Sequence, residues 1–144
     1  MTTIRHSVAV NASPDAIEAY SRYAESWPDW FPGVVSVEVD DAYPAVNSTA
    51  QVTFQAAGTT FDLLLMVLEY LPGERVVYEL QGMAQGQASF SISAEEAEQQ
   101  VDGIIEYELP GGVLGRIADF AVVEQRVSES LEQALFNLKA GIEG

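Results

Sequence analysis

The sequence predicts an α+β fold, a curved seven-stranded antiparallel sheet wrapped around one long C-terminal helix, with two short helices after the first strand. Seven segments have the character of strands, and short turns separate the last six of them. The final segment repeats its apolar side chains every three to four residues, as a helix does. Short turns make consecutive strands antiparallel. A sheet that buries one face of the helix must curve around it, which tends to leave a cavity between the two.

The first strand and the short helices are predicted from the first 33 residues. Residues 3–10 alternate between apolar and polar side chains, as a strand does. Ser13, Pro14 and Asp15 then favour a helix start, because serine caps, proline suits the first position and an acid suits the first turn. We expect two short helices with a bend over residues 14–30, ended by Pro32 and Gly33.

Six further strands follow, separated by residues typical of turns. They are expected at residues 34–40, 49–56, 60–70 and 75–81, through Ala88, Phe90 and Ile92, and at 101–109. Residues 60–70 are apolar on both faces in their middle, which predicts a central strand covered on both sides. The acidic segment Glu95–Gln100 is expected to be a turn.

The final helix is expected over residues 110–142, a length of roughly 45 Å. Its apolar side chains share one arc of a helical wheel: Val113, Ile117, Phe120, Val127, Leu131, Leu135, Leu138 and Ile142. Glu124 falls in the middle of this arc, and Val122 and Val123 fall on the outer side. A buried carboxylate needs a partner, a raised pKa or water, so Glu124 is singled out as a candidate functional residue.

The composition excludes several kinds of site. The 144 residues suit one domain over residues 1–144. No cysteine is present, so disulfides, thiolate zinc sites and cysteine nucleophiles are excluded. The one histidine, His6, excludes a histidine-cluster metal site. We therefore expect no metal and no cofactor.

The charge of the chain limits its partners. With 22 acidic and 6 basic residues, the net charge of −16 repels nucleic acids and anionic membrane surfaces. The acidity is either a solubility feature or an adaptation to a salty cytoplasm. The N-terminus lacks the apolar core of a signal peptide, and the longest apolar run, Leu63–Leu68, is too short to span a bilayer. We expect a cytoplasmic protein that does not insert into membranes, as a monomer or homodimer.

The order of elements and several local signatures resemble the START-like, helix-grip superfamily often called SRPBCC, and within it the polyketide cyclase/dehydrase branch. The signatures are residues 11–17 after the first strand, the aromatic bend of residues 27–32, and residues 107–116, which lead into the final helix and its Asn137-Leu138-Lys139. The resemblance covers residues 3–142. It implies a helix-grip fold with a hydrophobic cavity between helix and sheet, and it implies no universal catalytic residue.

Large side chains on inward positions are the candidate ligand contacts, because aromatic rings give apolar area and Trp and Tyr add a polar group. They are Trp27, Trp30, Phe31, Phe54, Phe61, Tyr78, Phe90, Tyr107, Ile117, Phe120 and Glu124. Plain core packing is the alternative for most of them. Glu124 and His6 are the candidates for proton transfer, although a lone histidine on a strand is more often a hydrogen-bonded core or rim residue.

The main functional prediction is that a hydrophobic, lipid- or polyketide-like molecule binds in the cavity. One alternative is a cyclase or aromatase that uses Glu124 or His6 to move protons. A second alternative is a protein-interaction module with a filled core, in which Val122 and Val123 belong to a partner surface. The few ionisable groups at inward positions favour binding over chemistry.

Overall fold

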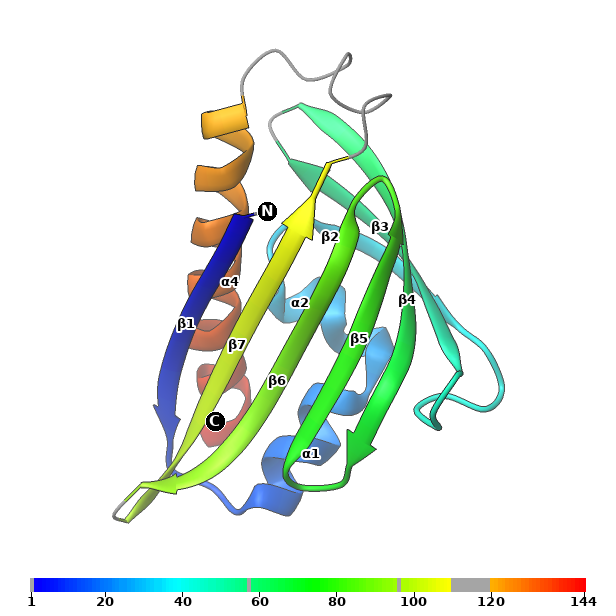
Figure 1. The fold of residues 1–144 in the computed structure, drawn as a ribbon. Helices are drawn as coiled ribbons and strands as arrows, with labels where there is room; N and C mark the ends of the chain where they lie inside the picture. The colour runs from blue at the N-terminus through cyan, green and yellow to red at the C-terminus, as the bar shows by residue number, and fades with distance from the viewer. Residues whose placement is uncertain (1, 57, 96, 110–119) are drawn as a thin grey trace.

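The computed structural model describes residues 2–56, 58–95, 97–109 and 120–144. The seven strands form one antiparallel sheet in the order β1-β7-β6-β5-β4-β3-β2. Their bounds are β1 Thr2–Val10, β2 Val34–Val39, β3 Thr49–Ala56, β4 Thr59–Leu71, β5 Arg75–Gly82, β6 Gln85–Glu95 and β7 Glu98–Glu108. The helices are α1 Pro14–Arg22, η1 Ala24–Ser26, α2 Trp27–Trp30 and α4 Phe120–Glu143. The curved sheet and its helices form the expected helix-grip fold (Figure 1).

The short helices begin where the sequence predicts. The Ser13 hydroxyl accepts a hydrogen bond from the Ala16 amide at 3.1 Å, which caps α1, and Pro14 occupies the first turn. Ile17 is fully buried on the inner face of α1. The Asn137 side chain donates to the Trp30 carbonyl at 3.1 Å and so connects α4 to α2. These contacts position α1 and α2 on the same face of the sheet as α4 (Figure 1).

Two sequence predictions about the strands are wrong. Glu95–Gln100 is not all turn, because Ala94 pairs with Gln99 and Glu95 with Glu98 in a long hairpin. The polar composition of this segment is typical of a turn. Both faces of the hairpin end are largely open to water, however, and a strand in such a place can carry polar side chains on both faces. The middle of β4 is not covered on both sides, since the described helices lie on one face only (Figure 1).

The outer face of β4 is partly covered by its neighbouring strands. Leu64 and Met66 are half-buried there. Leu64 lies between Gln51 and Gln81, and Glu79 is opposite Met66. The aliphatic parts of such long polar side chains can cover apolar neighbours without a second layer of structure.

Helix α4 packs closely against Gly103 of β7. A Cβ atom at this position would lie 3.0 Å from Leu131 Cδ1 and 3.2 Å from Phe90 Cε1. Leu131 is fully buried, as are Leu135 and Leu138 of the same helix. A residue without a side chain is therefore what allows the helix to pack here.

The inner face of α4 differs from the prediction at its N-terminal part. Val123 is buried with 3% exposure, whereas Glu124 is exposed. The buried positions repeat every three to four residues and are Val123, Leu131, Ala134, Leu135 and Leu138, with Val127 half-buried. The predicted inner positions Val127, Leu131, Leu135 and Leu138 are confirmed, and the prediction is wrong at Glu124 and at Val123, which was expected on the outer side. Residues 110–119 of the predicted helix lie outside the described residues. None of the described helices has the length and apolarity to cross a membrane.

Candidate functional site

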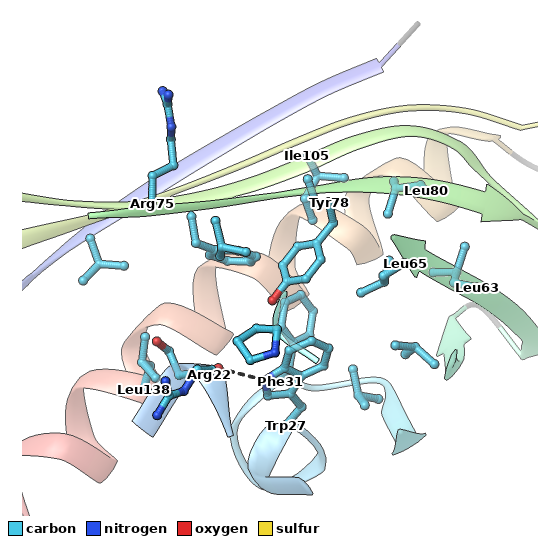
Figure 2. Close-up of a pocket in the computed structure, with 18 of the residues that line it drawn as sticks. Arg22, Trp27, Phe31, Leu63, Leu65, Arg75, Tyr78, Leu80, Ile105 and Leu138 are labelled. Carbon is cyan, nitrogen blue, oxygen red and sulfur yellow. Dashed lines mark hydrogen bonds between the residues drawn. The ribbon is translucent and has the colours of Figure 1, made fainter. Parts of the chain in front are cut away.

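A cavity of about 190 Å³ lies between the concave face of the sheet and the helices. Figure 2 shows Leu63, Leu65, Tyr78 and Leu80 on the sheet side, with Trp27 and Phe31 opposite them. Many of the predicted ligand contacts lie in the cavity wall: Trp27, Trp30, Phe31, Phe54, Phe61, Tyr78, Phe90 and Tyr107. That they bind a ligand stays a prediction.

The remaining predicted residues lie elsewhere. Ile117 is outside the described residues, and so is the side chain of Phe120. Glu124 is exposed rather than buried and is not part of the cavity wall. Its negative charge still affects Tyr107: the pKa of Tyr107 is raised mainly by burial and, to a smaller extent, by repulsion from Glu124.

His6 also lies outside the cavity wall. It projects from β1 toward α4, where its Nε2 is 2.9 Å from the Ser128 hydroxyl and its Nδ1 is 3.6 Å from a Glu132 carboxylate oxygen. The side chain is 25% exposed. These contacts make His6 a hydrogen-bonded rim residue between β1 and α4, the structural alternative that the sequence left open.

Trp27 organises the aromatic part of the wall. Its indole Nε1 donates to the Ser21 carbonyl at 2.8 Å, which fixes the ring on the end of α1. The ring stands edge-on to Tyr43 and Tyr78, with centroids 6.2 Å and 6.0 Å away and interplanar angles of 80° and 82°. Edge-to-face contacts of this kind are favourable because ring edges are electropositive and ring faces electronegative. One tryptophan therefore sets the orientation of two tyrosines.

The hydroxyls of Tyr43 and Tyr78 are hydrogen-bonded to each other at 2.8 Å. Tyr78 is 4% exposed and points from the sheet toward Trp27 (Figure 2). Burial raises the pKa of Tyr43 to about 12 and that of Tyr78 well above its ordinary value. Both phenols are therefore neutral at physiological pH.

A second polar group lies where the cavity reaches solvent. Tyr70 donates a hydrogen bond to Glu18, and Arg22 donates to the Tyr70 hydroxyl at 3.2 Å. Arg22 is also 3.6 Å from Glu18, and its side chain is 45% exposed. The pKa of Tyr70 is raised by burial and by the Glu18 hydrogen bond. All three residues line the cavity, and we call them the mouth cluster.

Sequence reasoning missed Tyr70 of the mouth cluster because of a bulge in β4. Strict alternation from Phe61 through Val67 would place Glu69 inward and Tyr70 outward. The pairing of β4 with β5 shifts between Val67 and Glu69, so that Tyr70 pairs with Val76 and lines the cavity. Glu69 instead forms an ion pair with Arg75 at 2.5 Å. A bulge reverses the side on which the following side chains lie.

Tyr43 was missed for a different reason. It lies in the segment between β2 and β3, whose polar composition predicts a turn. Its packing against Trp27 and its hydrogen bond to Tyr78 place it in the wall. Within the described residues, no group of three or more His, Cys, Asp or Glu side chains is arranged to hold a metal ion.

The sequence matches a described family over almost its whole length. The family described as polyketide cyclase / dehydrase and lipid transport matches residues 1–143. No curated protein matches the sequence.

Several solved structures share the fold. TTHA0849 from Thermus thermophilus has a TM-score of 0.80 and 19% identity, covering 99% of this chain and 97% of that one. The Zhui aromatase/cyclase from Streptomyces sp. R1128 has a TM-score of 0.78 and 14% identity, covering 99% and 93%. The di-domain ARO/CYC StfQ of the steffimycin biosynthetic pathway has a TM-score of 0.77 and 16% identity, covering 98% of this chain and 50% of StfQ. At these identities the likeness concerns the fold alone.

Proposed function

The chain belongs to the polyketide cyclase/dehydrase and lipid transport family, and from this premise we propose that it binds a compact hydrophobic molecule, lipid- or polyketide-like, between the sheet and the helices. The observation that carries the proposal is the cavity itself, whose wall is formed mainly by aromatic and aliphatic side chains. Burying the apolar body of a ligand there would contribute about 25 cal/mol for each Å² removed from water.

The cavity volume limits the size of the ligand. At about 190 Å³ it is smaller than the roughly 300–1,000 Å³ of pockets for drug-sized ligands. It is larger than an engineered apolar cavity of about 150 Å³ in another protein, which binds benzene. This comparison favours a ligand, or an inserted ligand segment, of one or two rings and argues against the alternative of a filled core.

The arrangement supports binding more than proton transfer. Neither Glu124 nor His6, the two predicted proton-transfer residues, is part of the described wall. Several ionisable groups in the wall pair with one another, in the Tyr43–Tyr78 bond and in the Glu18–Tyr70–Arg22 contacts. Paired groups of this kind orient a ligand by hydrogen bonds.

The test is a titration with small aromatic probes followed by NMR. Toluene and naphthalene should shift the indole N–H resonances of Trp27 and Trp30, because both rings line the cavity. The substitution Ala88→Phe should weaken or abolish these shifts, since Ala88 is 7% exposed and its new ring would occupy the cavity. Ala84→Leu, also in the wall, should act in the same direction.

The matched control is Ala94→Phe. Ala94 lies on the same strand as Ala88 but is exposed, so its substitution should leave probe binding within twofold of the unchanged protein, an allowance of about 0.4 kcal/mol. If neither probe shifts the indole resonances of the folded protein, the proposal is wrong.

A further inference from the structure

The Tyr43–Tyr78 pair has one more hydrogen-bond donor than it uses. Each phenol carries one O–H donor and can also accept. The single bond of 2.8 Å between the two oxygens uses one proton. In the part of the chain that the structure describes, neither hydroxyl has another hydrogen-bond partner. Whichever tyrosine donates to the other, one O–H remains available.

The available O–H belongs to the buried Tyr78 or the half-buried Tyr43 and lies in a largely apolar wall. Both tyrosines line the cavity, and Trp27 stands edge-on to both rings. Leu65, Leu80 and Phe31 form the neighbouring wall (Figure 2). A buried donor without an acceptor is unfavourable. A ligand that brings an acceptor to this point would therefore be preferred over one of the same shape that does not.

We propose that the Tyr43–Tyr78 pair is a binding site for a hydrogen-bond-accepting oxygen, in the first place the carbonyl oxygen of a neutral ketone carried on a small aromatic body. The inference rests on the proposed function, because it assigns the polar contact that orients the bound molecule. A carbonyl fits because it accepts and does not donate. The neutral phenols remain donors throughout the physiological pH range.

A charged acceptor fits the site less well. The nearest cations in the wall, Arg22 and Arg75, already pair with Glu18 and Glu69. In Figure 2 the Arg75 side chain points away from the cavity. A carboxylate transferred from water to the apolar wall would lose its hydration without gaining a counter-ion. The net charge of −16 also opposes the approach of anions.

The experiment compares two probes of the same shape. Acetophenone carries a carbonyl group, and α-methylstyrene replaces its oxygen by a methylene group. Their dissociation constants are measured by NMR titration in the unchanged protein and in the Tyr43→Phe/Tyr78→Phe double variant. Because the hydrocarbon is intrinsically more hydrophobic, the quantity compared is the ratio of the two affinities in each protein. The affinity for acetophenone relative to that for α-methylstyrene should fall about five- to tenfold in the double variant, as expected for the loss of one hydrogen bond.

The single variants sharpen the test. Tyr43→Phe and Tyr78→Phe each leave one phenol free to donate, so each should keep most of the preference for acetophenone. The carbonyl stretch of bound ¹³C-labelled acetophenone gives an independent signal. It should lie at lower frequency in the unchanged protein and the single variants than in the double variant. Tyr23→Phe is the control, since Tyr23 is 58% exposed and lies outside the wall.

The outcomes separate this inference from the proposed function. If both probes bind the unchanged protein but the affinity ratio and the carbonyl frequency are the same in the double variant, the tyrosine pair does not hold the oxygen and only the inference is overturned. If neither probe binds the folded protein, both proposals are overturned. A change in the ratio with Tyr23→Phe as large as in the double variant would also contradict the assignment.

Discussion

At the scale of single residues, the buried phenols of Tyr43 and Tyr78 make stability depend on alkaline pH. Burial raises the pKa of Tyr43 from 10.0 to about 12 and raises that of Tyr78 well above 10.0. A pKa raised in the folded state means that the stabilising contribution is complete below the unfolded-state pKa of 10.0 and is lost as pH rises through the folded-state value.

The free energy of unfolding should therefore fall between about pH 10 and pH 12, by on the order of 2–3 kcal/mol from Tyr43 alone. Urea unfolding at a series of pH values measures it. The Tyr43→Phe/Tyr78→Phe variant removes both ionisations, so its stability should depend less steeply on pH in this range. If the free energy of unfolding changed equally with pH in the two proteins, the pKa values of these phenols would not differ between the folded and unfolded states, and the expectation would be wrong.

The residue scale is also where sequence reasoning had mixed success. The aromatic side chains of strands and of the bend at residues 27–32 were predictable, because size and alternation place them inward. Tyr43 and Tyr70 were not, since one depends on tertiary packing and the other on a bulge. Glu124 was misplaced because one helical position, about 100°, separates it from the buried Val123.

At the scale of elements, the contact of α4 with β7 depends on Gly103. A methyl group there would lie too close to Leu131 and Phe90. Leu131 is fully buried, so surrounding atoms hinder its side chain from moving away. We expect Gly103→Ala to lower the free energy of unfolding by about 1–2 kcal/mol. Urea or thermal unfolding measures the loss.

A second substitution checks the cause of this loss. Leu131→Val removes the Cδ1 atom that would meet the new methyl group, so Gly103→Ala should cost less in that background than alone. A stabilising effect of Gly103→Ala, through lower chain entropy in the unfolded state, would contradict the tight contact.

The elements themselves were largely predictable from the sequence. Ser13 and Pro14 mark the start of α1, and short turns predict the antiparallel order of β2 to β7. The extent of the β6–β7 hairpin was underestimated at Glu98 and Gln100, because polar composition does not distinguish a turn from a strand pair that water covers. Pairing partners, rather than side-chain polarity, decide where such strands end.

At the scale of the whole molecule, the excess of acidic residues opposes folding by mutual repulsion. The chain has 22 acidic and 6 basic residues, and folding brings the excess charges closer together. Salt weakens this repulsion, since the Debye length falls from about 30 Å at 0.01 M to about 3 Å at 1 M.

The melting temperature should therefore rise by several degrees between about 0.01 M and about 0.5 M NaCl. Thermal unfolding followed by circular dichroism measures it. If screening is the cause, KCl should raise the melting temperature as much as NaCl at the same ionic strength. Sucrose at equal osmolality should not reproduce the steep rise in melting temperature at low salt. A melting temperature that is constant or falls with salt would contradict the expectation.

The place of the first strand in the sheet is a property of the whole chain that local patterns only partly predict. Strand β1 pairs with β7 from Thr2↔Tyr107 to Val10↔Gln99, so the first strand of the sequence lies beside the last one and β2 forms the opposite edge of the sheet. Alternation predicts that residues 3–10 form a strand but does not say which strand it joins. The resemblance to the helix-grip superfamily implied a curved sheet around the helix, and the structure gives both the partner of β1 and its register.

The position of the two tryptophans has a practical consequence. Trp27 and Trp30 are the only tryptophans in the sequence, and both lie in the cavity wall with 8% and 5% exposure. All indole emission from the protein therefore originates at the cavity. Tyr43 and Tyr78, in edge contact with Trp27, can pass absorbed light to it. The molecule thus carries its own optical reporter, so that any occupant of the cavity can be followed by a change in emission without a label.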